Sequence, residues 1–295
     1  MTAPQRIVSL LPSATDLLFD LLTDLGLAGR VVGVSHSCDH PRARHLPVLT
    51  RSIVDSGAPQ AEIDRAVSEA VREGRALYQV DGERLDRLKP DLVVTQGVCE
   101  VCAVTPGTLQ DAVRYLPGCL PAANVLSLDG RSVQGILDDL RALAAAAGLP
   151  ETGEALARQA QADWDAIRPV PHAPRVLTLE WTEPPFSGGH WVPEQVVRAG
   201  GMNVLGTPGT DSGRATWEQI APLRPDVSVV LCCGYGLRDN VTFARDLPDL
   251  PLGEVWAVDA NALFSRPALG VVRGAQVLAE LLRGQAVPGH SERIR

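Results

Sequence analysis

Cysteine and histidine side chains gather at a few points of this 295-residue chain, and their spacing could support metal or thiol chemistry. Cys99 and Cys102 form one Cys-x-x-Cys motif, and Cys38 is the best candidate for a third thiolate ligand. His190 or Cys233 could complete the set, because zinc and iron–sulfur centres accept such donors. Three interpretations stay open: a metal site at Cys38, Cys99 and Cys102, a redox dithiol, or packing of small apolar side chains.

Aromatic side chains form the second group of interest. They make up only 4% of the chain, yet Trp181, Trp191, Tyr235 and Phe264 all fall on loops that follow predicted strands. A flat macrocycle edged with amides needs a wall of this kind, with apolar faces and a few polar donors. Arg266 could meet an anionic group of the same ligand. The alternative is that these aromatic residues belong to the core.

Nucleotide-binding and hydrolase motifs are absent from the sequence. No GxGxxG follows a strand, and neither GxxxxGK[ST] nor GxSxG occurs. The net charge of −8 lacks the basic footprint of a nucleic-acid binder. No run approaches the ~18 apolar residues that a membrane-spanning helix needs. We therefore expect binding of a small molecule without catalysis, without nucleic acid and without membrane insertion.

Strand and helix patterns alternate along the chain. Short apolar runs predict strands over 7–11, 31–34, 92–95, 125–128, 175–180, 227–231 and 255–258. Thr15 is a plausible N-cap for a helix over 16–25, and helical spacing predicts further helices over 61–74, 193–199 and 267–283. This alternation implies parallel sheets with covered faces, whose ligands bind beyond the carboxyl ends of the strands.

Residues 132–168 break this alternation with two helical runs and no strand. The stretch is rich in alanine and lacks the Ser and Gly enrichment of a flexible linker, so it predicts a helical connector. We therefore expect an α/β fold with two lobes, each with a mainly parallel sheet flanked by helices. The predicted N-terminal lobe covers 1–130, the connector 131–170 and the C-terminal lobe 171–295.

A nine-residue pattern occurs once in each predicted lobe. The segments that start at Glu83 and Glu218 both place Pro-Asp seven residues after the glutamate and directly before an apolar run. A basic residue and Pro-Asp before a strand are common in α/β proteins, so chance is one explanation. The shared offset favours the other, namely two lobes of the same architecture with an equivalent surface glutamate on each.

Five stretches carry a resemblance to a known family, and they lie at 7–16, 32–41, 88–94, 184–189 and 264–267. In this order, and over nearly the whole chain, they resemble the class III substrate-binding proteins of ABC importers, most closely the cobalamin (vitamin B12)-binding branch. The resemblance implies two α/β lobes joined by a rigid helix, little closure on binding, and a corrinoid or iron chelate in the cleft between the lobes. The chain departs from the family's pattern in a helical insert near 58–79 and in its number of cleft cysteines.

The resemblance and the positions of the strand ends together predict the binding residues. By the resemblance, Glu83 and Glu218 match the lobe-tip glutamates that pair with arginines of an ABC permease dimer. The predicted ligand contacts are Pro12, Ser13, Cys38, Asp39, Gly97, Cys99, Trp181, His190, Trp191, Cys233, Tyr235, Phe264 and Arg266.

These observations predict a non-enzymatic protein that holds cobalamin or a related corrinoid for ABC-type import. The alternatives are a cytosolic thiol-ligated zinc or iron–sulfur protein on the same fold, and an iron-siderophore or haem receptor. Six cysteines are too few and too clustered for a disulfide scaffold, and the first residues contain no basic segment followed by a long apolar one. We therefore expect a cytosolic protein, or an extracytoplasmic one whose leader is not part of this sequence.

Overall fold

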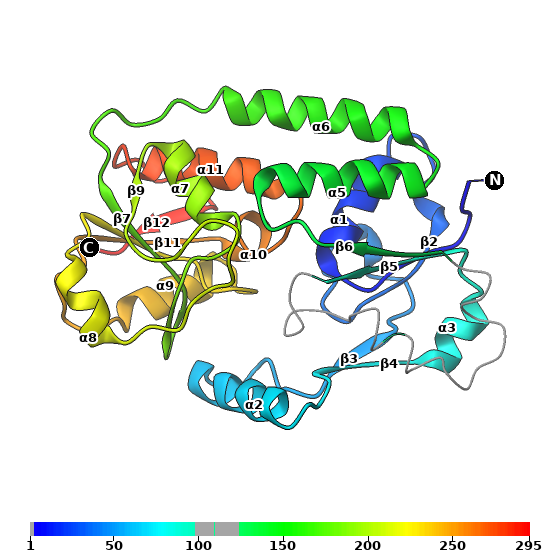
Figure 1. Ribbon diagram of the computed structural model, residues 1–295, viewed down its shortest axis with the longest axis horizontal. Coiled ribbons are helices and arrows are strands. Elements are labelled where there is room, and N and C mark those ends of the chain that lie inside the picture. Colours follow the sequence, from blue (N-terminus) through cyan, green and yellow to red (C-terminus); the bar gives the residue numbers. More distant parts are fainter. Residues whose placement is uncertain (1–2, 98–108, 110–123) are drawn as a thin grey trace. The chain divides into compact units, whose positions relative to one another are not determined.

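The computed structural model describes residues 3–97, 109 and 124–295, which divide into two compact units (Figure 1). Unit 1 consists of Met1–Gly130 and Gln134–Gln159, and unit 2 of Arg131–Val133 and Ala160–Arg295. Each unit has a largely parallel sheet with flanking helices, as the alternation of strands and helices predicted. Within the described residues, no helix combines the length and apolar character that crossing a membrane requires.

Unit 1 is built on four parallel strands in the order β2-β1-β5-β6. The central strand β5 is buried along its whole length, which explains its unbroken apolar pattern. On one face of the sheet, Val8 and Val93 pack against Leu85 of helix α3. The bounds are β1 Ile7–Ser9, β2 Val31–Val34, β5 Leu92–Gln96, β6 Asn124–Leu128 and α3 Gly82–Leu88.

Helix α1 (Pro12–Leu22) begins earlier than the sequence pattern indicated. The predicted start at residue 16 with Thr15 as N-cap is wrong. Pro12 occupies the first turn, where its fixed φ and its missing N–H suit a helix start. Thr15 lies inside the helix, and its hydroxyl donates a hydrogen bond of 2.9 Å to the hydroxyl of Ser9.

The helical insert predicted near residues 58–79 contains helix α2 (Gln60–Arg72). It lies between strands β3 (Thr50–Ser52) and β4 (Tyr78–Val80), which form an antiparallel ribbon of their own (Figure 1). The predicted helical spacing was therefore right, and the strands on both sides of it were missed.

Helices α5 (Val133–Ala146) and α6 (Pro150–Asp165) follow β6 in the chain. They coincide with the two helical runs in the predicted connector. Gly153 of α6 lies against α5, because a Cβ at this position would come within 2.2 Å of the Ala144 Cβ. The glycine therefore allows the two helices to pack closely.

Unit 2 is built on three central parallel strands, β7, β10 and β11. Strands β8 and β12 add to them in antiparallel, and the short β9 pairs with β7 in parallel. Helices α7 and α11 pack against each other on one face of the sheet, and α9 covers β10 and β11 on the other (Figure 1). Short helices α8 and α10 follow β9 and β11. The bounds are β7 Arg175–Thr182, β8 Pro185–Ser187, α7 Val192–Ala199, β9 Met202–Asn203, α8 Trp217–Ile220, β10 Val227–Val230, α9 Leu237–Arg245, β11 Glu254–Val258, α10 Ala260–Leu263, α11 Gly270–Leu281 and β12 Ser291–Arg293.

The repeated nine-residue pattern has the same structure in both units. In unit 1, the Asp91 carboxylate accepts hydrogen bonds from the backbone N–H groups of Gln5 (2.8 Å) and Arg6 (2.9 Å), directly before β1. In unit 2, the Asp226 carboxylate accepts one from the N–H of Arg175 (2.8 Å), at the start of β7. We call these two arrangements the strand clasps. Each clasp joins the amino ends of two neighbouring parallel strands.

The basic residue of the pattern also has one conformation in both copies. Lys89 and Arg224 have φ values of 45° and 42°, in the left-handed region where the preceding helical turn ends. Proline follows each of them, and it cannot continue a helix. The repeat in the sequence therefore has a structural cause, because it ends a helix and fastens the next strand.

Candidate functional site

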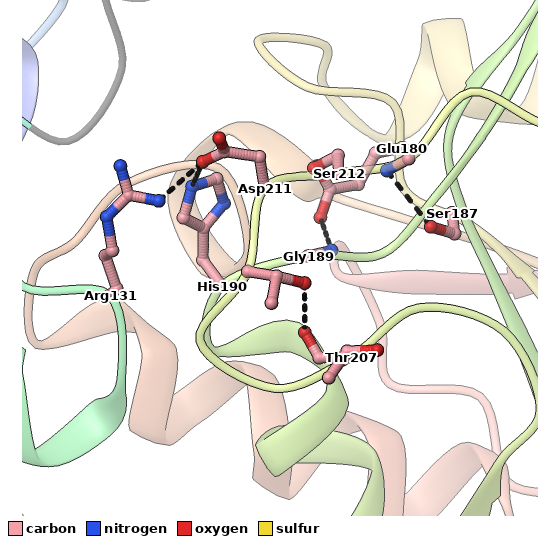
Figure 2. Close-up of polar contacts among 10 residues, drawn as sticks. Arg131, Glu180, Ser187, Gly189, His190, Thr207, Asp211 and Ser212 are labelled. Carbon is pink, nitrogen blue, oxygen red and sulfur yellow. Dashed lines mark hydrogen bonds and ion pairs between the residues drawn. The ribbon is translucent and has the colours of Figure 1, made fainter.

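Several loops at the carboxyl edge of the unit 2 sheet converge on Glu180, near the end of β7. Its Oε1 accepts a hydrogen bond of 2.8 Å from the N–H of Gly189, and its Oε2 accepts one from the hydroxyl of Ser212 (Figure 2). Its backbone oxygen accepts the N–H of Cys233 at 3.0 Å. One residue of β7 thus fixes the loops that follow β8 and β10, together with the loop around residue 212.

The electrostatics of Glu180 follow from its burial. Removal from water raises the pKa of its carboxyl, and the hydrogen bonds from Ser212 and Gly189 offset part of that shift. Gly189 has to be a glycine here, because a Cβ would lie 2.4 Å from the backbone nitrogen of Ser212. The carboxylate and the glycine together allow the two loops to approach closely.

His190, Asp211 and Arg131 form a polar chain beside Glu180 (Figure 2). Oδ1 of Asp211 lies 3.1 Å from Nε2 of His190 and 2.6 Å from Nη1 of Arg131. Burial lowers the pKa of the His190 ring, although Asp211 acts in the opposite direction. The Arg131 guanidinium is the main cause that lowers the pKa of Asp211, so this carboxylate is ionised at neutral pH.

Two aromatic rings stand at the same edge of the unit 2 sheet. Trp181 and Tyr235 have ring centroids 5.7 Å apart at an interplanar angle of 52°. Phe243 of α9 supports the tyrosine edge to face, at 4.9 Å and 85°. Trp181 and Tyr235 are partly exposed, so their free surface forms a supported aromatic wall.

Not every predicted aromatic contact lies at the surface. Trp191 is 5% exposed and Phe264 is 2% exposed. The indole N–H of Trp191 donates to the backbone oxygen of Phe264 at 2.8 Å. The structure thus places both rings in the core of unit 2, where they pack beneath the loops at the carboxyl edge of the sheet. They offer little surface to a ligand.

The adjacent cysteines after β10 face opposite ways. Cys232 is fully buried and Cys233 is exposed, as the alternation of side chains at a strand end requires. The following loop is joined to the loop after α10, since the N–H of Gly234 donates to the hydroxyl of Ser265 at 3.1 Å. Arg266 donates to the side-chain oxygen of Asn261 at 3.0 Å, which places it beside the same edge.

In unit 1, the predicted contacts lie at the carboxyl ends of β1, β2 and β5. Pro12 and Ser13 open α1, with Ser13 buried, while Asp39 and Gly97 are exposed. Sγ of Cys38 lies 3.0 Å from the hydroxyl oxygen of Thr15. Burial raises the pKa of the Cys38 thiol, so the group is a protonated thiol at neutral pH.

Cys99 and Cys102 lie outside the described residues, so the three-thiol metal site stays a prediction. Within the part of the chain that the structure describes, no group of three or more His, Cys, Asp and Glu side chains is placed to hold a metal ion. A thiolate site at Cys38 would also have to overcome the raised pKa of that thiol.

The sequence pattern did not reveal the polar chain around Asp211. Its members come from positions 131, 190 and 211, and Arg131 and Asp211 are 80 residues apart. The Gly, Ser, Asp and Thr content of residues 206–213 predicts a loop, but it does not predict which residues the loop contacts. Only the folded arrangement brings these charges together.

The chain is similar to a known protein family and to several solved structures. Residues 7–249 match the model of a family described as periplasmic binding protein. A comparison with curated proteins gives no match. Among solved structures, the periplasmic vitamin B12-binding protein BtuF of Vibrio cholerae has 21% sequence identity and a TM-score of 0.60, over 95% of this chain and 97% of that chain.

Two further structures show the same fold. A periplasmic haem-binding protein from Pseudomonas aeruginosa has 20% identity and a TM-score of 0.66, over 98% of both chains. An ABC transporter substrate-binding protein from Listeria monocytogenes has 17% identity and a TM-score of 0.66, over 95% of this chain and 98% of that chain. At these identities, the likeness is one of fold.

The family match corrects one expectation from the sequence. The predicted cytosolic location is wrong, because the matched family is one of periplasmic binding proteins, and the similar B12-binding and haem-binding structures are periplasmic. The prediction relied on unpaired cysteines, which are a poor indicator of compartment. A thiol such as Cys232, with no exposed surface, is out of reach of an oxidant in any compartment.

Proposed function

Because the chain belongs to the periplasmic binding protein family, we propose that it binds cobalamin or a related corrinoid without transforming it. The observation that carries the proposal is the partly exposed pair of Trp181 and Tyr235 at the carboxyl edge of the unit 2 sheet. A corrin ring presents a broad apolar face, which aromatic rings contact well. Its amide-bearing rim needs polar partners, and exposed loop groups near this edge offer them.

Haem is the second candidate, and a specific observation favours it. The imidazole of His190 is held by Asp211, an arrangement that resembles the carboxylate-supported histidines of metal sites. The iron of haem accepts an imidazole ligand directly, whereas a cobalamin whose axial positions are filled does not. Both candidates are metal-centred tetrapyrroles, and they differ in whether the protein reaches the metal.

Titration of the purified protein with cyanocobalamin and with hemin tests the proposal. We expect cyanocobalamin to bind with a micromolar or lower Kd. Trp181→Ala and Tyr235→Ala should each weaken binding about 10-fold, because an aromatic contact of about 1.4 kcal/mol is lost. Trp164→Ala is the matched control, since Trp164 lies on α6, away from the sheet edge. Absence of binding at micromolar cyanocobalamin would overturn the corrinoid proposal, and tight hemin binding alone would select haem.

We further propose that Glu83 and Glu218 pair with basic residues of an ABC permease dimer. Glu83 is on the first turn of α3 with 81% of its side chain exposed, and its carboxylate lies 3.7 Å from Arg87, one turn along the helix. Glu218 is exposed on the first turn of α8. Both stand two residues after their N-caps, Asp81 and Thr216, so the two units present them in the same way. Their other role would be purely structural, as acidic groups at the positive end of a helix dipole.

A further inference from the structure

A cavity of about 420 Å³ lies in unit 1, beside the edge strand β2. Its apolar lining includes Phe19 of α1, Val31 of β2 and Leu46. A pocket of this volume suits a small molecule. Of the predicted ligand contacts of unit 1 that the structure describes, none lines this cavity. It is therefore a second candidate site, distinct from the residues that are predicted to hold the ligand of the proposed function.

Backbone hydrogen bonds hold one side of the cavity against β2. The N–H of Val34 donates to the oxygen of Pro47 at 3.0 Å, and the N–H of Leu49 donates to the oxygen of Val34 at 2.9 Å. Phe19 is held as well, because its ring stacks on that of His40 with centroids 4.5 Å apart and an interplanar angle of 19°. Two parts of the lining are thus fixed by contacts within the protein.

Two basic side chains, Arg42 and His45, line the same cavity, and both are exposed. Within the described residues, neither side chain forms an ion pair or a hydrogen bond, and no carboxylate is among the lining groups. The surrounding sequence is also basic, since no Asp or Glu occurs from residue 40 to residue 54, although the whole chain has a net charge of −8. The cavity thus combines an apolar lining with basic groups that no acid of the protein satisfies.

Arg30 provides an independent observation. Gly29 and Val31, its neighbours in the chain, both line the cavity. Within the described residues, the Nε and Nη1 atoms of Arg30 are enclosed and have no hydrogen-bond partner. Enclosing a charged donor without an acceptor is costly, because the group loses its hydration and gains nothing in return. An anion in the neighbouring cavity would lower this electrostatic cost.

We propose that this cavity binds a small organic anion, whose apolar body contacts Phe19 and whose carboxylate, sulfonate or phosphate group lies beside Arg42 and His45. An inorganic anion would leave the apolar lining without a partner, and a neutral apolar molecule would leave the basic groups unused. The inference goes beyond the proposed function, because the cavity shares no residue with the aromatic wall of unit 2. It assigns to unit 1 a binding site of its own.

Two fluorescent probes that differ in one charged group test the proposal. Anilinonaphthalenesulfonate carries a sulfonate, and N-phenylnaphthylamine has the same apolar body without it. We expect the folded protein to bind the sulfonate at a single saturable site, with a rise in fluorescence. The neutral probe should bind about 10-fold more weakly, because it lacks the charge-assisted contact. Naphthoate should displace the sulfonate probe, whereas inorganic phosphate should not.

Variants of Arg42 locate the bound probe. Arg42→Glu should weaken binding of the sulfonate probe about 10-fold, because it replaces an attraction with a repulsion. The same variant should not weaken binding of the neutral probe, and Arg42→Lys should keep most of the affinity for the sulfonate because it keeps the charge. Arg72→Glu is the matched control, since Arg72 is an exposed arginine of α2 in the same unit and does not line the cavity.

Four results would overturn the inference. The two probes bind equally well, or Arg42→Glu binds the sulfonate probe as the wild type does. Trp181→Ala weakens probe binding instead, which would place the probe at the aromatic wall of unit 2. Inorganic phosphate displaces the probe as readily as naphthoate does, which would indicate a site for a bare anion. None of these measurements uses a corrinoid or haem, so their outcome is independent of the proposed function.

Discussion

Within the part of the chain that the structure describes, three carboxyl groups bind a proton more tightly than they would in water. Loss of hydration is the main cause for Asp20, Asp139 and Glu180 alike, although Asp20 keeps more of its surface exposed than the other two. Asp139 and Glu180 are compensated by donors, since the N–H groups of Asp129 and Gly130 bond the first, and Gly189 and Ser212 bond the second. For Asp20, the second cause is repulsion from Asp16, one turn earlier in α1, which adds to the shift.

Asp20 therefore gives stability a pH dependence of known sign. Its pKa is raised from 3.8 to about 6, so between these values the folded chain keeps a proton that the unfolded chain has lost. Stability should fall as the pH rises through that window. We expect Asp20→Asn to stabilise the protein at pH 7.5 by about 1 kcal/mol, after a discount for solvent screening.

Urea unfolding at pH 4.5 and pH 7.5 checks the Asp20 prediction. The gain from Asp20→Asn should shrink at the lower pH, where wild-type Asp20 is largely protonated in the folded state. Asp24→Asn serves as the control, because Asp24 is an exposed carboxylate just beyond the same helix. An equal gain at both pH values would mean that the charge of Asp20 is not the cause.

Single residues were predictable where one local rule decides their position. The alternation of side chains along β10 correctly separated exposed Cys233 from buried Cys232. The same rule could not tell that Trp191 packs inward, because a loop aromatic can lie on a ligand or on the core. Glu180 was missed as a site residue because its partner Ser212 is 32 residues away.

Among the elements, strongly apolar strands were the most predictable, whereas a helix rich in polar residues was not predicted. Helix α9 was missed, and only Asn240, Val241 and Ala244 are buried in it. Asn240 is the unexpected member of that set. Its side-chain oxygen accepts the N–H of Cys232 at 2.9 Å, and its amide donates to Val258 at 2.9 Å. A polar residue thus fixes α9 to the ends of two strands, and a hydrophobic pattern cannot reveal that.

The strand clasps yield a prediction about stability. Asp91→Ala removes the acceptor for two backbone N–H groups, and Asp226→Ala removes the acceptor for one. Hydrogen bonds to a charged group are worth about 1.5–3 kcal/mol, so Asp226→Ala should cost about 2 kcal/mol. Asp91→Ala should cost more. Urea unfolding of both variants measures the difference.

Asp249→Ala is the control for the clasp variants, since Asp249 is an exposed carboxylate on a loop of unit 2. We expect it to change the free energy of unfolding by less than about 0.5 kcal/mol, as surface substitutions usually do. If Asp91→Ala and Asp226→Ala behave like this control, the clasps are a consequence of the fold and not a support for it.

For the whole molecule, the alternation of strands and helices was sufficient to predict a two-lobed α/β architecture. Each helix buries its apolar face against a strand close to it in the sequence, so short segments are enough to reveal the apolar pattern. Location was not predictable in this way, because neither thiol count nor N-terminal composition measures compartment directly. The ligand contacts also depend on loops, whose conformations are set by partners far away in the sequence.

Glu83 and Glu218, the first residues of the repeated nine-residue pattern, allow a test of transport by the whole protein. Charge reversal at both, Glu83→Arg with Glu218→Arg, should abolish transport by the cognate permease and leave ligand affinity unchanged. The reason is that two ion pairs constrain orientation better than one, although each alone is worth about 1 kcal/mol or less. Glu151→Arg is the matched control, because Glu151 is also an exposed first-turn glutamate, on α6. Full transport by the double variant would leave the glutamates with a helix-dipole role only.

Unit 1 is completed by residues that the ribosome adds only after the chain has entered unit 2. Residues 134–159 belong to it, although residues 131–133, which precede them, belong to unit 2. During synthesis the first 130 residues leave the ribosome without α5, and at about 5–20 residues per second the missing part follows about 1.5–6 s later. Until then, the surfaces that bury Ile136 and Leu140 in the finished unit stay open to water. A nascent chain of this protein therefore exposes apolar surface for a time, which a chain with two contiguous units would avoid. A chaperone could bind that surface.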